Sequence, residues 1–211
     1  MEFTNRQKIV RKYTGHHNDY KLYRDNLAND FYHRCAYCDT LDNIITTPFE
    51  IDHFIPRNTF KDIKNNLECD YDNLIYSCKK CNRSKGSKFS GDITAENPTN
   101  ELFYDPVETN YNDIFYRNKY GIIMSDDPKG KNMIAEMRLY RPIYALAWII
   151  GQANSVIDTL DKRIAITKNS DEFNALQTVK IKLTNYVYKI NRIFIANYNS
   201  NNDFNNLEEY T

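Results

Sequence analysis

The chain has 211 residues, which suits one domain with an appendage or two small domains, and 41% of them are apolar, enough for a real core. Lys and Arg together number 28, as do Asp and Glu, so the formal net charge is zero. This balance excludes a generic polycation that coats nucleic acid by summed phosphate neutralisation, so contact with nucleic acid must come from a local basic patch.

Hydrophobic patterning favours a cytoplasmic protein with no membrane contact. Residues 1–18 are charged and contain no apolar segment of a signal peptide. The longest apolar run, residues 143–150, is far shorter than the roughly 20 residues that span a bilayer. Thiols stay reduced in the cytoplasm, so cysteines spaced Cys-x-x-Cys indicate a metal site before a disulfide.

The N-terminal part of the chain is predicted to form one amphipathic helix. Between residues 16 and 33 apolar side chains recur at helical spacing, at Tyr20, Tyr23, Leu27 and Phe31. Residues 49–55 then alternate and are rich in β-formers, and Pro56 follows them. They predict a strand that ends at the pair Asp52-His53. Residues 57–70 are predicted as a polar loop in which a helical turn can form, and a short helix is expected to start near Cys81.

The second half of the chain predicts a hairpin followed by helices. Residues 114–116 and 122–124 are apolar segments joined by a turn that contains Gly121, which indicates a β-hairpin. Residues 126–130 read as a loop and as the best domain boundary. Pro142 suits the first position of a helix, and two apolar runs with 3–4 spacing then predict an antiparallel helical pair. The tail, residues 197–211, is Asn-rich, acidic at its end and disordered in composition.

These patterns divide the chain into four segments. We expect a helical lead-in at residues 1–34, a core with two cysteine pairs at 35–95, a hairpin and linker at 96–131, and a helical region at 132–211.

Two pairs of cysteines predict a structural zinc site. Structural zinc takes four ligands tetrahedrally, and thiolates two residues apart can reach the same ion. The pairs are Cys35 with Cys38 and Cys78 with Cys81. Their separation exceeds the usual zinc-ribbon spacing, so the strand that carries Asp52 and His53 must be built between them. The alternative is buried cysteines without a metal.

Between the cysteine pairs lie the residue types that phosphodiester hydrolysis requires. The reaction needs a water nucleophile, a base, and positive charge on the phosphoryl and leaving oxygens. His53 suits the base because imidazole titrates near neutrality. Asp52 and Asn82 offer the oxygen ligands that Mg²⁺ prefers. Asn73 can orient the imidazole of His53.

At these positions the sequence resembles an HNH nuclease of the ββα-metal class, in the variety with two zinc knuckles. The resemblance covers roughly residues 35–90 and rests on Cys35-x-x-Cys38, on residues 50–56, on Asp72-Asn73-Leu74 and on Cys78-x-x-Cys81-Asn82-x-x-Lys85-Gly86. It implies that His53 is the general base, that Asp52 and Asn82 hold a catalytic Mg²⁺ or Mn²⁺, and that Asn73 positions His53. The third signature residue is Asn82 rather than His, which keeps an oxygen ligand.

The expected fold class is therefore α+β. It comprises a zinc-stabilised ββα-metal core with an N-terminal helix, a β-hairpin and a C-terminal antiparallel helical pair.

Basic residues near the predicted centre are candidates for contact with DNA phosphates. Residues 79–88 contain five basic residues and no acidic one. We expect phosphate contacts from Arg57, Arg83, Lys85 and Lys88. The carboxylate of Glu50 has two open interpretations: it supports the outer shell of the metal, or it is a solvated side chain of the strand.

Two other functions compete with DNA cleavage: a zinc-knuckle module that binds nucleic acid or acts as a scaffold without catalysis, and an RNA-directed nuclease. The order of segments also resembles small HNH proteins of bacterial restriction and anti-phage defence, including Septu-type systems in which the nuclease works with an ATPase partner. Cutting both strands with one centre would favour a homodimer or sequential nicking.

Overall fold

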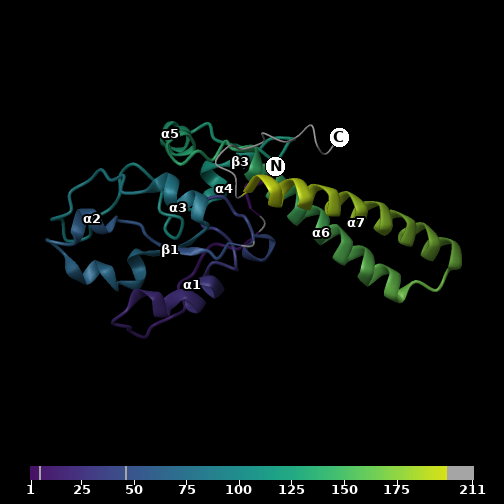
Figure 1. Ribbon diagram of the computed structural model, residues 1–211, viewed down its shortest axis with the longest axis horizontal. Helices are drawn as coiled ribbons and strands as arrows, with labels where there is room; N and C mark the ends of the chain where they lie inside the picture. Colours follow the sequence, from purple (N-terminus) through teal and green to yellow (C-terminus); the bar gives the residue numbers. More distant parts are fainter. Residues whose placement is uncertain (5, 46, 199–211) are drawn as a thin grey trace.

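The computed structural model describes residues 1–198 except positions 5 and 46. It is a mixed α+β domain from which two long helices project (Figure 1). The predicted fold class is confirmed. Residues 199–211, most of the tail predicted to be disordered, lie outside the described residues, while Asn197 and Tyr198 belong to the last helix. The four-segment division of the chain stays a prediction.

The predicted N-terminal helix is shorter than its apolar pattern. A 3₁₀ turn at Tyr20–Tyr23 (η1) leads into α1 at Arg24–Asp30. The carboxylate of Asp19 accepts a hydrogen bond from the Lys21 amide at 2.9 Å, which caps the turn and sets its start. Tyr32 and His33 both have positive φ, so the chain leaves the helix before reaching the first cysteine pair.

Two short strands and one helix form the core. Strand β1 (Glu50–His53) pairs antiparallel with β2 (Leu74–Ser77), with Asp52 opposite Ile75. Helix α3 (Lys79–Lys85) follows directly and packs on β1. The loop between the strands contains α2 (Arg57–Phe60) and 3₁₀ turns η3 (Asn65–Glu68) and η4 (Tyr71–Asn73); η2 (Asp42–Ile44) lies before β1.

The predicted hairpin is present, with two differences around it. Strand β3 (Tyr116–Arg117) pairs with β4 (Ile123–Met124), but Ile114 ends the short helix α4 (Tyr111–Ile114) and is not in the strand. The prediction of a loop at residues 126–130 is wrong, because Pro128 begins α5 (Pro128–Glu136). Asp127 caps this helix by accepting from the Gly130 amide at 2.7 Å, and proline fits the first helical position.

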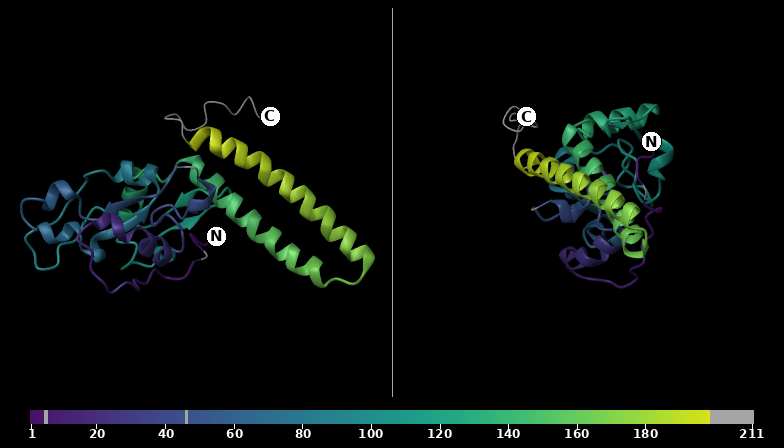
Figure 2. Two further views of the ribbon diagram at one scale, coloured as in Figure 1. Left: turned by 60° about the horizontal axis from the view of Figure 1, so that its bottom comes forward. Right: turned by 90° about the vertical axis from the view of Figure 1, so that its right-hand side faces the viewer.

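The C-terminal helices form the predicted antiparallel pair, and Pro142 begins the first. Helix α6 (Pro142–Ile166) and helix α7 (Ser170–Tyr198) contact each other along their length and extend away from the mixed domain (Figure 2). Only their inner ends are buried against the domain, through Ile143, Tyr144, Ile150, Ile190 and Phe194. In the described part of the chain, no helix is long and apolar enough to cross a membrane.

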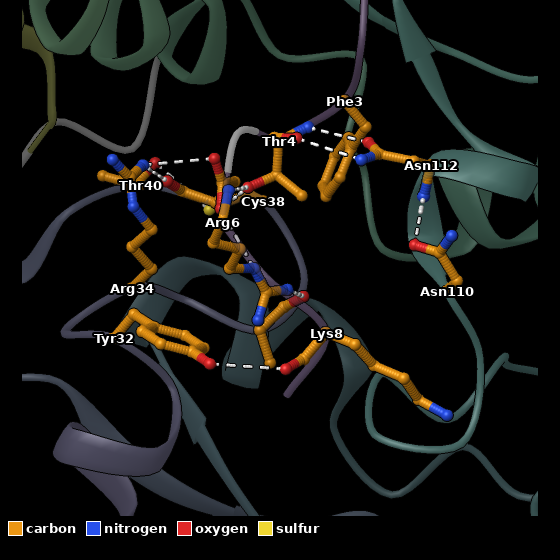
Figure 3. A network of polar contacts seen from close by, with 12 residues as sticks. Phe3, Thr4, Arg6, Lys8, Tyr32, Arg34, Cys38, Thr40, Asn110 and Asn112 are labelled. Carbon is orange, nitrogen blue, oxygen red and sulfur yellow. Dashed lines mark hydrogen bonds and ion pairs between the residues drawn. The ribbon is translucent and has the colours of Figure 1, made fainter. Parts of the chain in front are cut away.

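An extended N-terminal segment ties these parts together. The Thr4 amide donates to Asn112 Oδ1 and Asn112 Nδ2 donates to the Thr4 carbonyl, both at 3.0 Å (Figure 3). The Thr4 hydroxyl donates to Asp39, next to the first cysteine pair, at 2.7 Å. The buried guanidinium of Arg117 donates to the carbonyls of Phe3 and Cys38. The segment thus fixes the hairpin and α4 to the first cysteine turn.

Candidate active site and metal centre

The four paired cysteines converge on one point in the core. Their sulfur atoms all lie within 4.8 Å of one another, and all four residues are buried. The Sγ atoms of Cys38 and Cys78, one from each pair, are 3.9 Å apart. A tetrahedral zinc ion with Zn–S bonds near 2.3 Å requires sulfur atoms about 3.8 Å apart. The cluster could therefore hold a zinc ion, and the predicted pairing of the two turns is confirmed.

This cluster joins the core to the appended elements. Cys81 Sγ lies 3.5 Å from the hydroxyl of Tyr144 on α6. The carbonyl of Cys38 accepts from Arg117 Nη2 at 2.9 Å, which brings in the β3–β4 hairpin. The cysteine cluster is thus packed against the inner end of the helical pair. Its geometry affects the positions of α6 and of the hairpin as well as the core.

Asp52 lies on β1 with both carboxylate oxygens bonded inside the protein. Its Oδ2 accepts from the Tyr37 hydroxyl at 2.6 Å, and its Oδ1 lies 3.0 Å from the Lys85 ammonium. Burial raises the pKa of the carboxyl, while the charge of Lys85 and the hydrogen bond from Tyr37 act in the opposite direction. These two neighbours hold the group in one orientation and favour its ionised form, the form that binds a cation.

His53, the next residue, is held so that one ring nitrogen acts as a base. Its Nε2 lies 3.0 Å from the Glu68 carbonyl, which can only accept, so Nε2 carries the proton and Nδ1 carries the lone pair. The rings of Tyr20 and Phe60 pack against the imidazole, with centroids 4.9 and 5.8 Å away. Burial lowers the pKa of His53 below its ordinary 6.5, so the imidazole is neutral at physiological pH.

Asn82 is oriented by Glu50 across the gap between α3 and β1. Its Nδ2 donates to Glu50 Oε2 at 2.8 Å, which fixes the orientation of the amide. The sequence left open whether Glu50 supports the metal shell or is simply solvated. In the structure its carboxylate accepts a hydrogen bond from Asn82. A carboxylate from β1 therefore sets the orientation of an amide on α3.

An open pocket of about 400 Å³ brings these groups together. Asp52 and His53 line it from β1, Asn82 from α3, and Tyr20 and Arg57 from the other side. The carboxylate of Asp52 and the amide of Asn82 in this lining offer the oxygen donors that Mg²⁺ takes, with water and phosphate completing its shell. The residues present fit a divalent cation beside a neutral imidazole.

The sequence suggested that Asn73 orients the imidazole of His53. In the structure Asn73 bonds the neighbouring backbone instead. Its Oδ1 accepts from the Ile55 amide at 2.8 Å, and its Nδ2 donates to the carbonyls of Ile55 and Leu67. Ile55 follows His53 by two residues, and Leu67 precedes Glu68, whose carbonyl holds the imidazole. Asn73 therefore fixes the backbone on both sides of His53, and the ring is positioned through that backbone.

The predicted phosphate contacts separate into two kinds. Lys85 is wrong as a surface contact, because its side chain is 0% exposed and its ammonium is bonded to Asp52 and to the His53 carbonyl. Its place four residues after buried Cys81 puts it on the inward face of α3, a signal that the sequence contained. Lys88 is exposed but paired with Glu136 of α5 at 2.9 Å. Arg83 and Arg57 are exposed, and Arg57 pairs with Glu68 at 2.5 Å.

Three contributors to the site were missed from the sequence. Tyr37, between the first two cysteines, bonds Asp52; Tyr20 packs on His53; and the Glu68 carbonyl binds its Nε2. The first could have been sought because a buried tyrosine hydroxyl needs a partner. The other two depend on how distant segments meet, and the local pattern contains no signal for them.

Comparisons with known proteins find a family match over the segment that contains this site. Residues 35–88 match a family model described as HNH endonuclease, so the chain contains an HNH endonuclease domain in that segment. The chain is also 29% identical over 154 residues to a Bacillus thuringiensis protein named Septu protein PtuB. The matched part covers 71% of this chain and 54% of that protein, so the chain spans about half the length of this curated relative. No solved structure matches the chain.

Proposed function

We propose that the protein is a metal-dependent endonuclease that hydrolyses DNA phosphodiester bonds at the pocket beside His53. One observation carries the proposal: a neutral imidazole with a free Nδ1 lines the same pocket as the oxygen donors Asp52 and Asn82. A base next to a cation-binding pair is the combination that hydrolysis of a phosphodiester requires.

In this proposal His53 takes the proton from the attacking water at Nδ1. The Glu68 carbonyl holds the opposite nitrogen and stabilises the imidazolium that results. Asp52 and Asn82 would hold a Mg²⁺-type ion, which when bound supplies positive charge to the phosphoryl and leaving oxygens. Tyr37 and Lys85 keep Asp52 in place, and Glu50 does the same for Asn82.

The cysteine cluster has a different role in this proposal. Zinc bound by Cys35, Cys38, Cys78 and Cys81 has four protein ligands, which leaves no open position for chemistry. It would be structural. Cys78 directly precedes α3 and Cys81 lies within it, so the ion would fix the helix that presents Asn82.

We further propose that the nuclease acts in defence against phage. The support is the likeness to the protein named Septu protein PtuB, which is 29% identical over 154 residues. A partner ATPase or another defence subunit would restrain the activity. A second copy of this chain would supply a second catalytic centre for cutting both strands. RNA is the second candidate substrate, because phosphate contacts do not select deoxyribose.

Incubation of supercoiled plasmid with the full chain tests this function. We expect nicked or linear DNA with Mg²⁺ or Mn²⁺ and intact plasmid without added metal. A parallel panel of single-stranded and duplex RNA separates the second candidate. If nucleic acid is bound but none is cut with any divalent metal, the protein is a binding or scaffold module and the proposal fails.

A further inference from the structure

A stripe of polar side chains runs along the outer face of α7. Its members are spaced three or four residues apart, so they lie on one face of the helix. All are exposed: Asn174, Thr178, Lys182, Asn185, Lys189 and Arg192. We call these six residues the α7 stripe. The buried residues of the same helix, among them Val187, Ile190 and Phe194, lie on the other side.

The charge around this stripe has one sign. Residues 173–198 include four basic residues and no acidic residue. Of the four, Lys180 is paired with Asp161 of α6, while the nearby Glu172 is bound by Arg163. Within the described residues, the three cations of the stripe have no ion-pair partner. The helix therefore presents uncompensated positive charge in a chain with zero net charge.

The chemistry of the stripe matches a sugar–phosphate backbone. Lysine, arginine, asparagine and threonine are the side chains that donate to phosphate oxygens in protein–DNA complexes. Two exposed tyrosines flank it, Tyr186 at 52% and Tyr188 at 63% exposure, and tyrosine is also among the side chains that hydrogen-bond phosphate and sugar. An acidic protein surface would match the charge as well, but the asparagines and threonine of the stripe favour phosphate.

The stripe also continues from the nuclease domain. The inner end of α7 reaches α3, where the Lys80 ammonium lies 5.4 Å from the centroid of the Tyr198 ring. Lys80 precedes Asn82 by two residues on α3. At a rise of about 1.5 Å per residue, Arg192 is about 9 Å and Lys182 about 24 Å along the helix from Tyr198. The stripe therefore starts near the helix that carries Asn82 and extends outward along α7.

We propose that the α7 stripe binds the backbone of duplex DNA flanking the scissile phosphate. The inference rests on the proposed nuclease function and adds a binding surface outside the HNH domain. Two of the predicted phosphate contacts are not available, because Lys85 is buried and Lys88 is paired with Glu136. The stripe would supply affinity for DNA in their place. Contacts of this kind give affinity without sequence preference.

The salt dependence of binding tests the surface directly. In the His53→Ala background without added divalent metal, anisotropy of a labelled 30-base-pair duplex is measured over a salt series. Replacing all three cations (Lys182→Gln, Lys189→Gln, Arg192→Gln) should reduce the slope of log K against log salt by about 2.7, since each phosphate contact contributes about 0.9. Affinity near 0.1 M salt should fall by about tenfold or more.

A matched control removes three other exposed lysines, Lys131, Lys162 and Lys168, by the same change to Gln. This triple variant should keep the wild-type slope. Equal slopes for wild type and the stripe variant, or equal losses in the stripe and control variants, would overturn the proposal and leave the stripe as a solvated or protein-binding face. Gln is a good helix former, and unchanged circular dichroism confirms that α7 is intact.

Cleavage separates this inference from the proposed function. With His53 restored, the stripe variant should lose more of its kcat/KM on the 30-base-pair duplex than on one of 6 base pairs, which is about 20 Å long and shorter than the distance of about 24 Å between Tyr198 and Lys182 along the helix. Equal activity of variant and wild type on both lengths would reject the stripe and keep the nuclease. Absence of cleavage by the wild type would reject the nuclease, whatever the binding slopes show.

Discussion

The ammonium of Lys85 lies 3.0 Å from Asp52 Oδ1, and the lysine side chain is fully buried. The pair connects α3 to β1 in the centre of the nuclease domain, and a second bond from Lys85 to the His53 carbonyl, at 2.7 Å, fixes the backbone of the base. A residue that the sequence assigned to DNA binding therefore supports the two residues that the sequence assigned to catalysis.

Removal of Lys85 should destabilise the fold. Lys85→Met leaves the Asp52 carboxylate buried without its cation, and breaking a buried pair on one side lowers stability by about 3–5 kcal/mol. Urea unfolding measures the change. Arg83→Gln, on the exposed side of the same helix, should alter stability by less than about 0.5 kcal/mol.

A second variant distinguishes pairing from packing. When Asp52→Leu is combined with Lys85→Met, no buried charge is left alone, and part of the lost stability should return although activity stays absent. Lys85→Met protein with wild-type stability and weaker DNA binding would restore the surface assignment of this lysine.

Loss of the cysteine-bound metal should unfold the core and loosen the helical pair. Metal analysis should give about one zinc per chain, and chelation or Cys81→Ser should lower Tm, because binding and folding of such sites are coupled. Cys69 lies outside the cluster, so Cys69→Ser should keep both zinc and Tm. Full zinc content and an unchanged Tm in the Cys81→Ser protein would argue against a tetrathiolate site.

Tyr20 should affect turnover through its ring rather than its hydroxyl. Its edge-to-face contact with His53 at 4.9 Å restrains the imidazole, and such aromatic pairs contribute about 0.5–1.5 kcal/mol. Tyr20→Ala should therefore lower kcat by about two- to tenfold, while Tyr20→Phe keeps it. The exposed neighbour Leu22 serves as the control position. Equal losses in the Phe and Ala variants would point to a role for the hydroxyl.

The imidazole of His53 should titrate below 6.5, because burial lowers its pKa. The unfolded chain then binds more protons than the folded one between the folded pKa and about 6.5. This contribution to stability is present above about pH 6.5 and is lost as the pH falls through the folded pKa. A two-dimensional NMR titration of the metal-free protein measures the midpoint. A midpoint above 6.5 would contradict the buried, neutral state.

The sequence sufficed for features encoded locally. The cysteine spacing, the alternation that ends at Asp52-His53 and the apolar periodicity of α6 and α7 are each set by residues close in the chain, and the structure has the corresponding elements. Helix α5 was missed although Asp127-Pro128 is a good start signal, because the same residues are also frequent in turns.

Features that depend on contacts between distant segments could not be predicted in the same way. Tyr20 meets His53, and Tyr37 meets Asp52, only because the lead-in and the first cysteine turn fold against β1. Asn73 was expected at the imidazole, yet it bonds the backbone of Ile55 and Leu67, since those groups would otherwise be buried without partners. Such partners are chosen by tertiary packing.

The most direct measurement of the central claim compares plasmid cleavage by the wild-type, His53→Ala and His16→Ala proteins in Mg²⁺. His16 is an exposed histidine, so its replacement controls for loss of an imidazole alone. We predict that the His53→Ala protein retains its zinc content and loses activity by about a hundredfold or more, the usual contribution of a general base, while the His16→Ala protein cuts normally. Cleavage by the His53→Ala protein at the wild-type rate would contradict the assignment of His53 as the base.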